Sequence, residues 1–346
     1  MRLRILSPLL MLFVAGCLLT AQTNSNAQKF SELTRTFRFT YNFTVKDIPS
    51  GAKRVRVWVP VPQTDRHQTV RVLAIKAPVK TQITDESEYG NRMMYAEIQN
   101  PASGKAEFAL EYEITRHEYS RGDYAQLERK DKDRQPIVVP ASMTRLLEPD
   151  NLIPTDGKIK ALAVEVTGSQ TGTVAKAKAA YDYFFTTMRY DKSGTGWGRG
   201  DAVWACDSKH GNCTDFHSPF IGVLRADRIP ARFDIGFPVP ENKEKGDIPG
   251  YHCWAEFYAA KTGWVPVDIS EAWKAKEKRD YFFGSVDANR VQFSTGRDIT
   301  LSPKQDGPAL NYFVYPYIEV DGKPYEKLDK QFSFEEVNGS AVMQSR

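Results

Sequence analysis

Hydrophobic and polar residues alternate over several stretches in the first third of the chain. The clearest stretches are residues 37–43, 55–59 and 108–114, in which every second side chain is apolar or aromatic. A period of two is typical of a strand that buries one face, and the clusters of glycine, proline, asparagine and aspartate between the stretches predict turns. We therefore expect residues 28–120 to form an antiparallel β-sandwich.

The pattern changes in the middle of the chain. Residues 158–166 and 173–188 contain no helix breaker, and the second stretch repeats its apolar side chains at helical spacing. A further amphipathic helix is expected to begin near Cys213 and to end near Ala226. The segment 121–157, dense in charge over its first half, is expected to be an exposed linker.

Short strands are expected after the helix that begins near Cys213. They are predicted at 231–238, 252–258 and 264–269, with a polar loop at 241–250. A β-rich part, residues 289–327, is expected to close this second domain. The whole is an α+β domain at 158–330, followed by a tail at 331–346.

The first residues have the features of an export signal. Arg2 and Arg4 precede a mainly apolar run that is too short for a comfortable transmembrane helix. The letters VAGC, ending at Cys17, resemble a bacterial lipobox and would place a lipid on Cys17. The letters SNA, ending at Ala27, resemble an ordinary signal-peptidase site. We expect residues 1–27 to be a signal segment and the protein to be exported, either periplasmic or anchored as a lipoprotein of a bacterial cell envelope.

Composition excludes few classes of function. The chain has 41% hydrophobic and 26% charged residues, and its net charge of +4 is small for 346 residues. Without a basic run we expect no nucleic-acid partner, and membrane contact only through an N-terminal lipid. A glycine-rich loop at 193–201 lacks the lysine and the strand-loop-helix context of a phosphate-binding loop, and no cofactor is expected.

Three residues spread over about 55 positions carry the candidate chemistry. A thiol becomes a strong nucleophile when a base takes its proton, and the base works best when an acceptor orients it. Cys213 is expected in the first turn of its helix, where unpaired N–H groups and the helix dipole favour a thiolate. His252 and Asp268, on the two strands that follow, would be the base and the acceptor.

The register of these two strands decides whether His252 reaches Asp268. If the two residues lie directly opposite each other, Tyr258 pairs with Thr262 across a three-residue loop, and both site side chains share one face. A slip by one residue would separate them. In the expected register Cys253 points away from the site, which singles out Cys213 as the nucleophile.

The same residues resemble the transglutaminase-like superfamily. The resemblance covers about residues 181–303 and rests on the motifs GNCTDF, RADRIPARF, YHCWAEFY and GWVPVDIS, with Arg228 where a glycine is usual. The stretch VWVPVPQTDRHQTV is similar to the sandwich that often precedes this core in exported proteins. The resemblance implies a papain-like α+β core with a catalytic triad of Cys213, His252 and Asp268. It implies acyl transfer or hydrolysis on peptide or protein amide bonds.

Further site residues follow from the needs of this chemistry. An oxyanion requires donors. The Cys213 N–H is one candidate, and the second is the indole of Trp204 or Trp197 or another group upstream. Trp254 either lines a substrate groove or packs in the core. In an oxidising compartment Cys206 and Cys253 would pair and leave Cys213 free; the alternative is two small buried thiols.

Three function classes are compatible with these residues. The first is an enzyme acting on a peptide or protein substrate, with hydrolysis ahead of cross-linking because water is abundant and no motif marks an amine site. The alternative is a non-catalytic binding or scaffold protein of the cell envelope with the same fold. A structural metal cluster that includes His210 and His217 is a third, but no pair of cysteines has the spacing typical of zinc sites.

Overall fold

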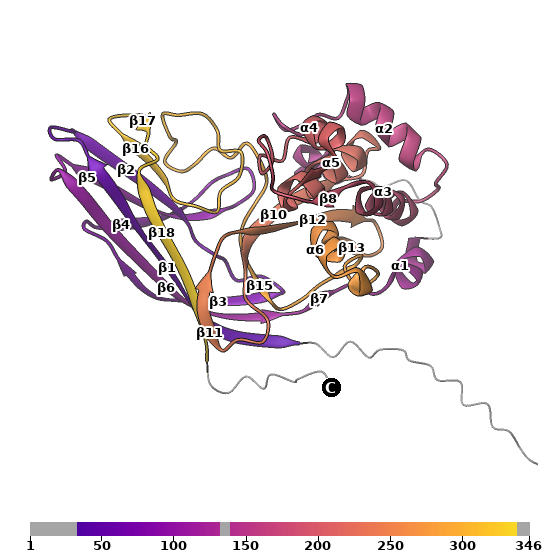
Figure 1. The fold of residues 1–346 in the computed structure, drawn as a ribbon, viewed down its shortest axis with the longest axis horizontal. Coiled ribbons are helices and arrows are strands. Elements are labelled where there is room, and N and C mark those ends of the chain that lie inside the picture. Colours follow the sequence, from indigo (N-terminus) through magenta and orange to yellow (C-terminus); the bar gives the residue numbers. More distant parts are fainter. Residues whose placement is uncertain (1–32, 132–138, 338–346) are drawn as a thin grey trace, which may run out of the picture. The chain divides into compact units, whose positions relative to one another are not determined.

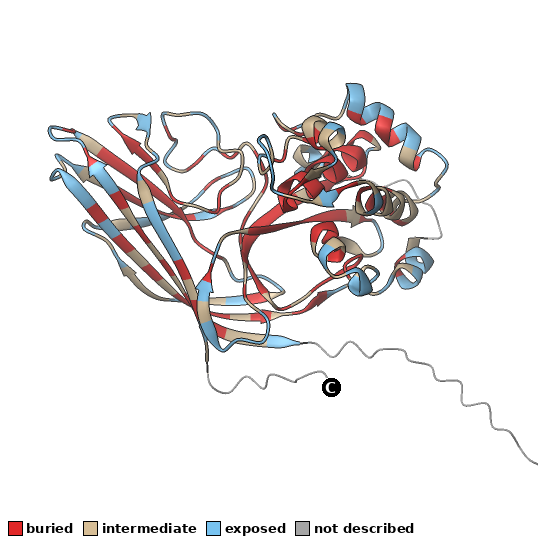
Figure 2. Ribbon diagram, in the orientation of Figure 1, coloured by how far each residue is buried: buried red, intermediate tan, exposed pale blue. Residues whose placement is uncertain are grey.

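The strictest alternation in the sequence forms the longest strand, β1 (Thr34–Ile48). Along it, inward residues from Phe37 to Val45 are buried while their neighbours are more exposed, a pattern visible along the strands in Figure 2. The computed structural model describes residues 33–131 and 139–337. The predicted signal segment, with Cys17, lies outside the described residues.

Two five-stranded antiparallel sheets form the predicted sandwich (Figure 1). Besides β1, their strands are β2 (Arg54–Pro60), β3 (Gln68–Lys76), β4 (Thr81–Asp85), β5 (Arg92–Gln99), β6 (Gly104–His117), β11 (Lys245–Ile248), β16 (Tyr317–Val320), β17 (Lys323–Pro324) and β18 (Leu328–Glu336). One sheet has the order β11-β18-β1-β6-β3 and the other β17-β16-β2-β5-β4. The three alternating stretches lie within β1, β2 and β6, which confirms them as strands.

The end of the chain completes the sandwich, contrary to the predicted division into domains. The prediction assigns residues 289–327 to the α+β domain and residues 331–346 to a tail. Instead β18 pairs with β1, with Phe334 opposite Phe39, and β16 pairs with β2. Strand β11, within the predicted loop 241–250, in turn pairs with β18. Each added strand satisfies backbone groups that the edge of a sheet leaves unpaired.

A third sheet carries the candidate site. It contains β10 (Ala231–Pro238), β12 (His252–Ala259), β13 (Gly263–Val267) and β15 (Arg290–Thr295), in the order β13-β12-β10-β15. The first three strands confirm the predicted strand positions. The last of them ends one residue before Asp268, which is the N-cap of a short helix, α6 (Ile269–Lys274), rather than a strand residue.

Helices surround the predicted central helix, α5 (Cys213–Ala226), every residue of which is buried. The others are α1 (Tyr124–Asp131), η1 (Ala141–Leu147), α2 (Gly157–Thr167), α3 (Thr173–Thr187), α4 (Ala202–Ser208) and the short η2 (Lys276–Lys278). The starts and ends of α2, α3 and α5 agree with the predicted helices. The segment predicted as a linker contains α1 and η1. Helix α5 packs against β10 and β12, which brings its first residue close to the start of β12.

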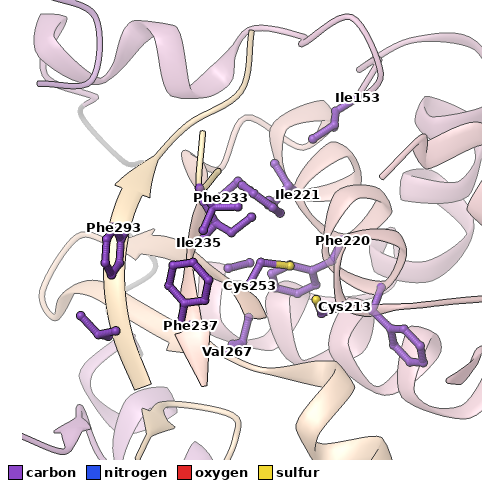
Figure 3. Close-up of a cluster of buried hydrophobic side chains, with 14 of the residues drawn as sticks. Ile153, Cys213, Phe220, Ile221, Phe233, Ile235, Phe237, Cys253, Val267 and Phe293 are labelled. Carbon is purple, nitrogen blue, oxygen red and sulfur yellow. The ribbon is translucent and has the colours of Figure 1, made fainter. Parts of the chain in front are cut away.

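Two short two-residue pairings and one aromatic cluster tie the parts together. Strands β7 (Tyr119–Ser120) and β14 (Ser285–Val286) pair, as do β8 (Arg189–Tyr190) and β9 (His210–Gly211). Phe237 and Phe293 of the third sheet lie with ring centroids 5.2 and 5.4 Å from that of Phe39 in β1. The sandwich and the α+β part therefore share one hydrophobic core, part of which is drawn in Figure 3.

Within the described residues, no helix has the length and apolar character needed to cross a membrane.

A prediction on stability follows from Gly236, which pairs with His252 in the third sheet. A Cβ atom at this glycine would lie 1.8 Å from the carbonyl oxygen of Val291, so that β10 and β15 would have to separate. We expect Gly236→Ala to lower the free energy of unfolding by about 3 kcal/mol, measured by urea denaturation. Gly250→Ala is the matched control, because its Cβ would lie 3.4 Å from the Tyr315 hydroxyl, an ordinary contact. Equal stability of the two variants would contradict this account.

Candidate active site

Cys213 is the first residue of α5, and its side chain is almost wholly buried, at 2% exposure. Asn212 caps the helix through its side-chain oxygen, which accepts the Thr214 N–H at 2.9 Å. Asp215 reaches back to accept the Asn212 N–H at 2.9 Å and so completes a capping box. The expected position at a helix N-terminus is confirmed, and the helix dipole there favours a thiolate.

Asp215 also holds the glycine-rich loop over the start of the helix. Its carboxylate accepts the N–H groups of Gly198 and Gly200 at 2.7 and 3.0 Å. From the other side, the guanidinium of Arg297 donates to the carbonyl oxygen of Arg199 at 3.0 Å. Gly211 has to be a glycine, because its φ is +151° and a Cβ would lie 2.2 Å from the Asp215 carboxylate. The loop is therefore built onto the helix that begins with Cys213.

His252 and Asp268 meet, although not through the predicted pairing. The His252 Nε2 atom lies 2.6 Å from Asp268 Oδ2, and both side chains are buried. The predicted register was wrong by two residues, because Tyr258 pairs with Trp264 and the turn closes at Ala259 and Gly263. The ladder ends with Ala255 opposite Val267, and Asp268 comes one residue later, at the start of α6, from where its side chain reaches His252.

Asp268 is a fully buried carboxylate held by several donors. Arg290 donates to Oδ2 at 2.8 Å, and the Ser270 hydroxyl and the Glu271 N–H each donate to Oδ1 at 3.0 Å. Burial raises the pKa of Asp268, but the charges of His252 and Arg290 outweigh it and hold the pKa well below its usual range. The carboxylate is therefore charged and keeps the His252 ring in one orientation.

The charges at Cys213 and His252 favour an ion pair. Burial lowers the pKa of His252, but the charge and hydrogen bond of Asp268 overcome it and raise the pKa to about 10. Burial raises the pKa of Cys213, whereas hydrogen bonding with Cys253 and His252 brings it well below its ordinary value. Because Nε2 of His252 is taken by Asp268, Nδ1 is the nitrogen left for Cys213. The site is arranged for a thiolate beside an imidazolium.

Cys253 lies close to Cys213, contrary to the expectation that it points away. Its Sγ is 3.7 Å from Nδ1 of His217, which sits one turn after Cys213 on α5, and it interacts with the Cys213 side chain. Figure 3 shows both thiols between α5 and the third sheet. The prediction failed because α5 packs against β12. A side chain on the face of β12 opposite to that of His252, such as Cys253, therefore contacts the helix. The spacing of four residues from Cys213 to His217 was the signal that could have revealed the contact.

The predicted disulfide between Cys206 and Cys253 is not formed, since both cysteines are free. Cys206 lies in α4, where burial raises the pKa of its thiol to about 11, and Lys158 and Asp207 lie near it. Cys253 instead lies on β12 and contacts His217 of α5. The two cysteines therefore belong to different environments. The alternative of two buried thiols is right for Cys253, whereas Cys206 is half-buried.

The three tryptophans occupy different places around the site. Trp204 packs beneath the glycine-rich loop, so close that a Cβ at Gly196 would lie 2.7 Å from its indole nitrogen. Trp197 is half-buried in the loop itself. Trp254 is fully buried, with its ring centroid 6.2 Å from that of His252 and the Arg290 guanidinium 5.0 Å above it. The oxyanion and substrate-lining roles of these residues stay predictions.

The third function class, a structural metal cluster, includes His210 and His217. In residues 33–131 and 139–337, no group of three or more histidine, cysteine, aspartate or glutamate side chains is arranged to hold a metal ion. His210 instead contacts the Asp191 carbonyl oxygen through Nδ1 at 3.2 Å, and His217 contacts Cys253 and the Ile269 N–H.

The chain is similar to several known proteins. An uncharacterized protein of Haemophilus influenzae is 27% identical over 374 aligned residues, which span 94% of this chain and 97% of the relative. The uncharacterized protein YebA of Bacillus subtilis is 27% identical over 125 residues, covering 32% of this chain and 17% of the relative. Among solved structures, a candidate cysteine protease from Cytophaga hutchinsonii superimposes with a TM-score of 0.55 at 17% identity. That superposition covers 87% of this chain and 98% of the other, which shows a shared fold.

The family match falls on the site itself. Residues 160–269 match the model of the transglutaminase-like superfamily, a span that contains Cys213, His252 and Asp268. Together with the helix-borne cysteine and the strand-borne histidine described above, this match shows that the chain contains a transglutaminase-like core at residues 160–269.

Proposed function

We propose that this protein is an exported cysteine enzyme that hydrolyses or transfers acyl groups at peptide or protein amide bonds. The observation that carries the proposal is the contact of 2.6 Å between His252 Nε2 and Asp268, which leaves Nδ1 for a cysteine at the start of a buried helix. The family of the core and the fold shared with a candidate cysteine protease support this class of reaction. Export rests on the basic and apolar N-terminal residues of the sequence.

Each member of the triad has a defined role in this proposal. The Cys213 thiolate attacks the carbonyl carbon of the amide, and the Cys213 N–H is one donor to the resulting oxyanion. His252 gives its Nδ1 proton to the leaving amine, and an acyl-enzyme thioester forms. A water molecule or an amine then attacks the thioester while His252 takes its proton, and the thiolate leaves. Asp268 keeps the ring orientation and stabilises the imidazolium.

Hydrolysis is the reaction that we expect to dominate. Water reaches every exported protein at high concentration, whereas an amine acceptor has to be bound. The substrate is expected to be a peptide or protein, including cell-wall peptides, because the family acts on amides of this kind. A screen of such substrates would establish the reaction.

The first prediction concerns the nucleophile. In a screen of peptide and cell-wall substrates, Cys213→Ala is expected to reduce kcat/KM by about 10³-fold or more, since the thioester cannot form. Cys206→Ala is the matched control, because Cys206 lies in α4 and is not part of the triad. If Cys213→Ala retained the wild-type rate, Cys213 would not be the nucleophile. If no substrate were turned over by the wild type, the non-catalytic scaffold would be the better account.

The second prediction concerns pH. Turnover needs the thiolate, which forms as pH rises through the lowered pKa of Cys213. It also needs the imidazolium, which is lost as pH rises through the His252 pKa of about 10. We expect a bell-shaped rate profile with its alkaline limb near pH 10, measured by steady-state kinetics. Alkylation of Cys213 by iodoacetamide needs only the thiolate, so it should be fast well below pH 8 and should not fall at high pH.

His252→Ala supplies the comparison for the alkylation measurement. Without the imidazolium the Cys213 thiol loses a stabilising charge, and alkylation at neutral pH should slow. A slow reaction with the pH dependence of an ordinary thiol, the same in both proteins, would remove the basis for an activated Cys213.

The third prediction concerns Asp268. In Asp268→Asn the ring loses its counter-charge, so the pKa of His252 should fall and the alkaline limb should move to lower pH. We expect kcat/KM to fall by about 10²-fold, because the ring is also less well oriented. Circular dichroism should confirm that the variant is folded, since Arg290 loses one of its partners. An alkaline limb that stays near pH 10 would show that Asp268 does not control His252.

A further inference from the structure

Two buried groups next to the nucleophile have no part in the proposed reaction. His217, on α5, and Cys253, on β12, both have 0% exposure. The Cys253 sulfur lies 3.7 Å from His217 Nδ1, and His217 Nε2 lies 3.0 Å from the backbone nitrogen of Ile269. Buried polar groups are costly unless they are hydrogen-bonded, so the direction of each bond can be worked out.

The backbone decides which nitrogen of His217 carries the proton. The Ile269 N–H can only donate, so Nε2 must accept and carries no hydrogen. Burial lowers the pKa of His217, which agrees with a neutral ring protonated on Nδ1. That N–H points toward the Cys253 sulfur and also reaches the carbonyl oxygen of Cys213, one turn back. The Cys253 sulfur therefore accepts a hydrogen bond from His217.

A sulfur that accepts from His217 keeps its own proton free to donate. Burial raises the pKa of Cys253 well above its ordinary value, and the neighbouring Cys213 adds to the effect, so Cys253 is a thiol. Its side chain interacts with that of Cys213, and Figure 3 shows the two thiols facing the same space between the helix and the sheet. Cys213 is then the acceptor of the Cys253 S–H.

We propose that Cys253 is a positioning residue for Cys213: its S–H, held in place by His217, donates a hydrogen bond to the Cys213 sulfur and stabilises the thiolate. The thiolate is thus supported from two sides, by the His252 imidazolium and by the neutral S–H of Cys253. The arrangement also explains how two adjacent cysteines differ in charge. Its importance for catalysis rests on the proposed function, but the hydrogen bond itself does not.

Other ionisable groups also act on the two sulfurs. They are His217 and Asp215 of α5, His252 of β12, Tyr190 of β8, Tyr251, Asp268, Arg297, Tyr312 and Tyr315. Substitution of Cys253 leaves all of them in place. A change in the ionisation of Cys213 in such a variant therefore reports on the S–H donor and on the packing at that position, which a second substitution separates.

The test is a thiolate titration of the whole protein under reducing conditions. Thiolate absorbance in the ultraviolet is followed against pH for the wild type, Cys253→Ala and Cys253→Ser, and each curve is corrected with the same protein carrying Cys213→Ala. Removing a donor to a charged sulfur should raise the Cys213 pKa in Cys253→Ala by about one unit, which is about tenfold less thiolate below that pKa. Cys253→Ser retains a hydroxyl donor and should show a clearly smaller shift.

Two results would overturn the proposal. One is an unchanged Cys213 pKa in Cys253→Ala; the other is an equal rise in the alanine and serine variants, which would assign the effect to packing. If Cys253→Ala does not fold, the infrared S–H band of Cys253 in the wild type replaces it: the band should shift when Cys213 ionises, and a constant band overturns the proposal. These readouts need no substrate. If the protein proved to have no activity, the proposed function would be wrong, but the measured hydrogen bond from Cys253 would stand. If the hydrogen bond proved absent, the proposed function would not be affected.

Discussion

The buried charge of Asp268 is the constraint around which the site is organised. A carboxylate at 0% exposure has lost its water and must recover hydrogen bonds and opposite charge from the protein. It does so from three elements: His252 on β12, Arg290 on β15, and the first turn of α6. Removing one partner of such a buried pair typically costs about 3–5 kcal/mol, so these elements cannot shift independently. The orientation of the His252 ring is a consequence of that requirement.

The same principle holds at the start of α5. Asp215 is buried and finds its donors in the capped helix and in the glycine-rich loop, while Arg297 satisfies the loop's carbonyl oxygens. The glycines of this loop have no side chains with which to pack, so two buried charges hold the backbone at these positions. The position of Cys213 is therefore fixed from the loop side by Asp215 and from the sheet side by the packing of α5 on β12.

The sandwich contributes to the site through the shared core and through hydrogen bonds to β15, such as the bond from the Gln292 N–H to the Gln68 side-chain oxygen. Aromatic rings of β1 pack against Phe237 and Phe293, and β15 carries both Phe293 and Arg290. The strand that supplies the counter-charge to Asp268 is thus also the strand that rests on the sandwich. Strand β18, from the end of the chain, adds Phe332 to this core, with its ring centroid 4.5 Å from that of Phe237 in β10.

The local pattern of the sequence determined many of the secondary-structure elements and the positions of the candidate site residues on them. Alternation predicted the strands β1, β2 and β6, helical spacing predicted α5, and the sequence around Cys213, His252 and Asp268 placed these three at a helix start and near two strands. His252 and Asp268 meet even though the predicted register was wrong by two residues, because Asp268 directly follows β13 and caps α6 beside the start of β12. Long-range pairing was beyond the reach of local pattern: β18 on β1, β11 on β18, and Arg290 as the partner of Asp268. The contact of Cys253 with His217 and Cys213 also depended on which face of β12 the helix covers, because alternation says which side chains share a face but only tertiary packing decides what that face meets.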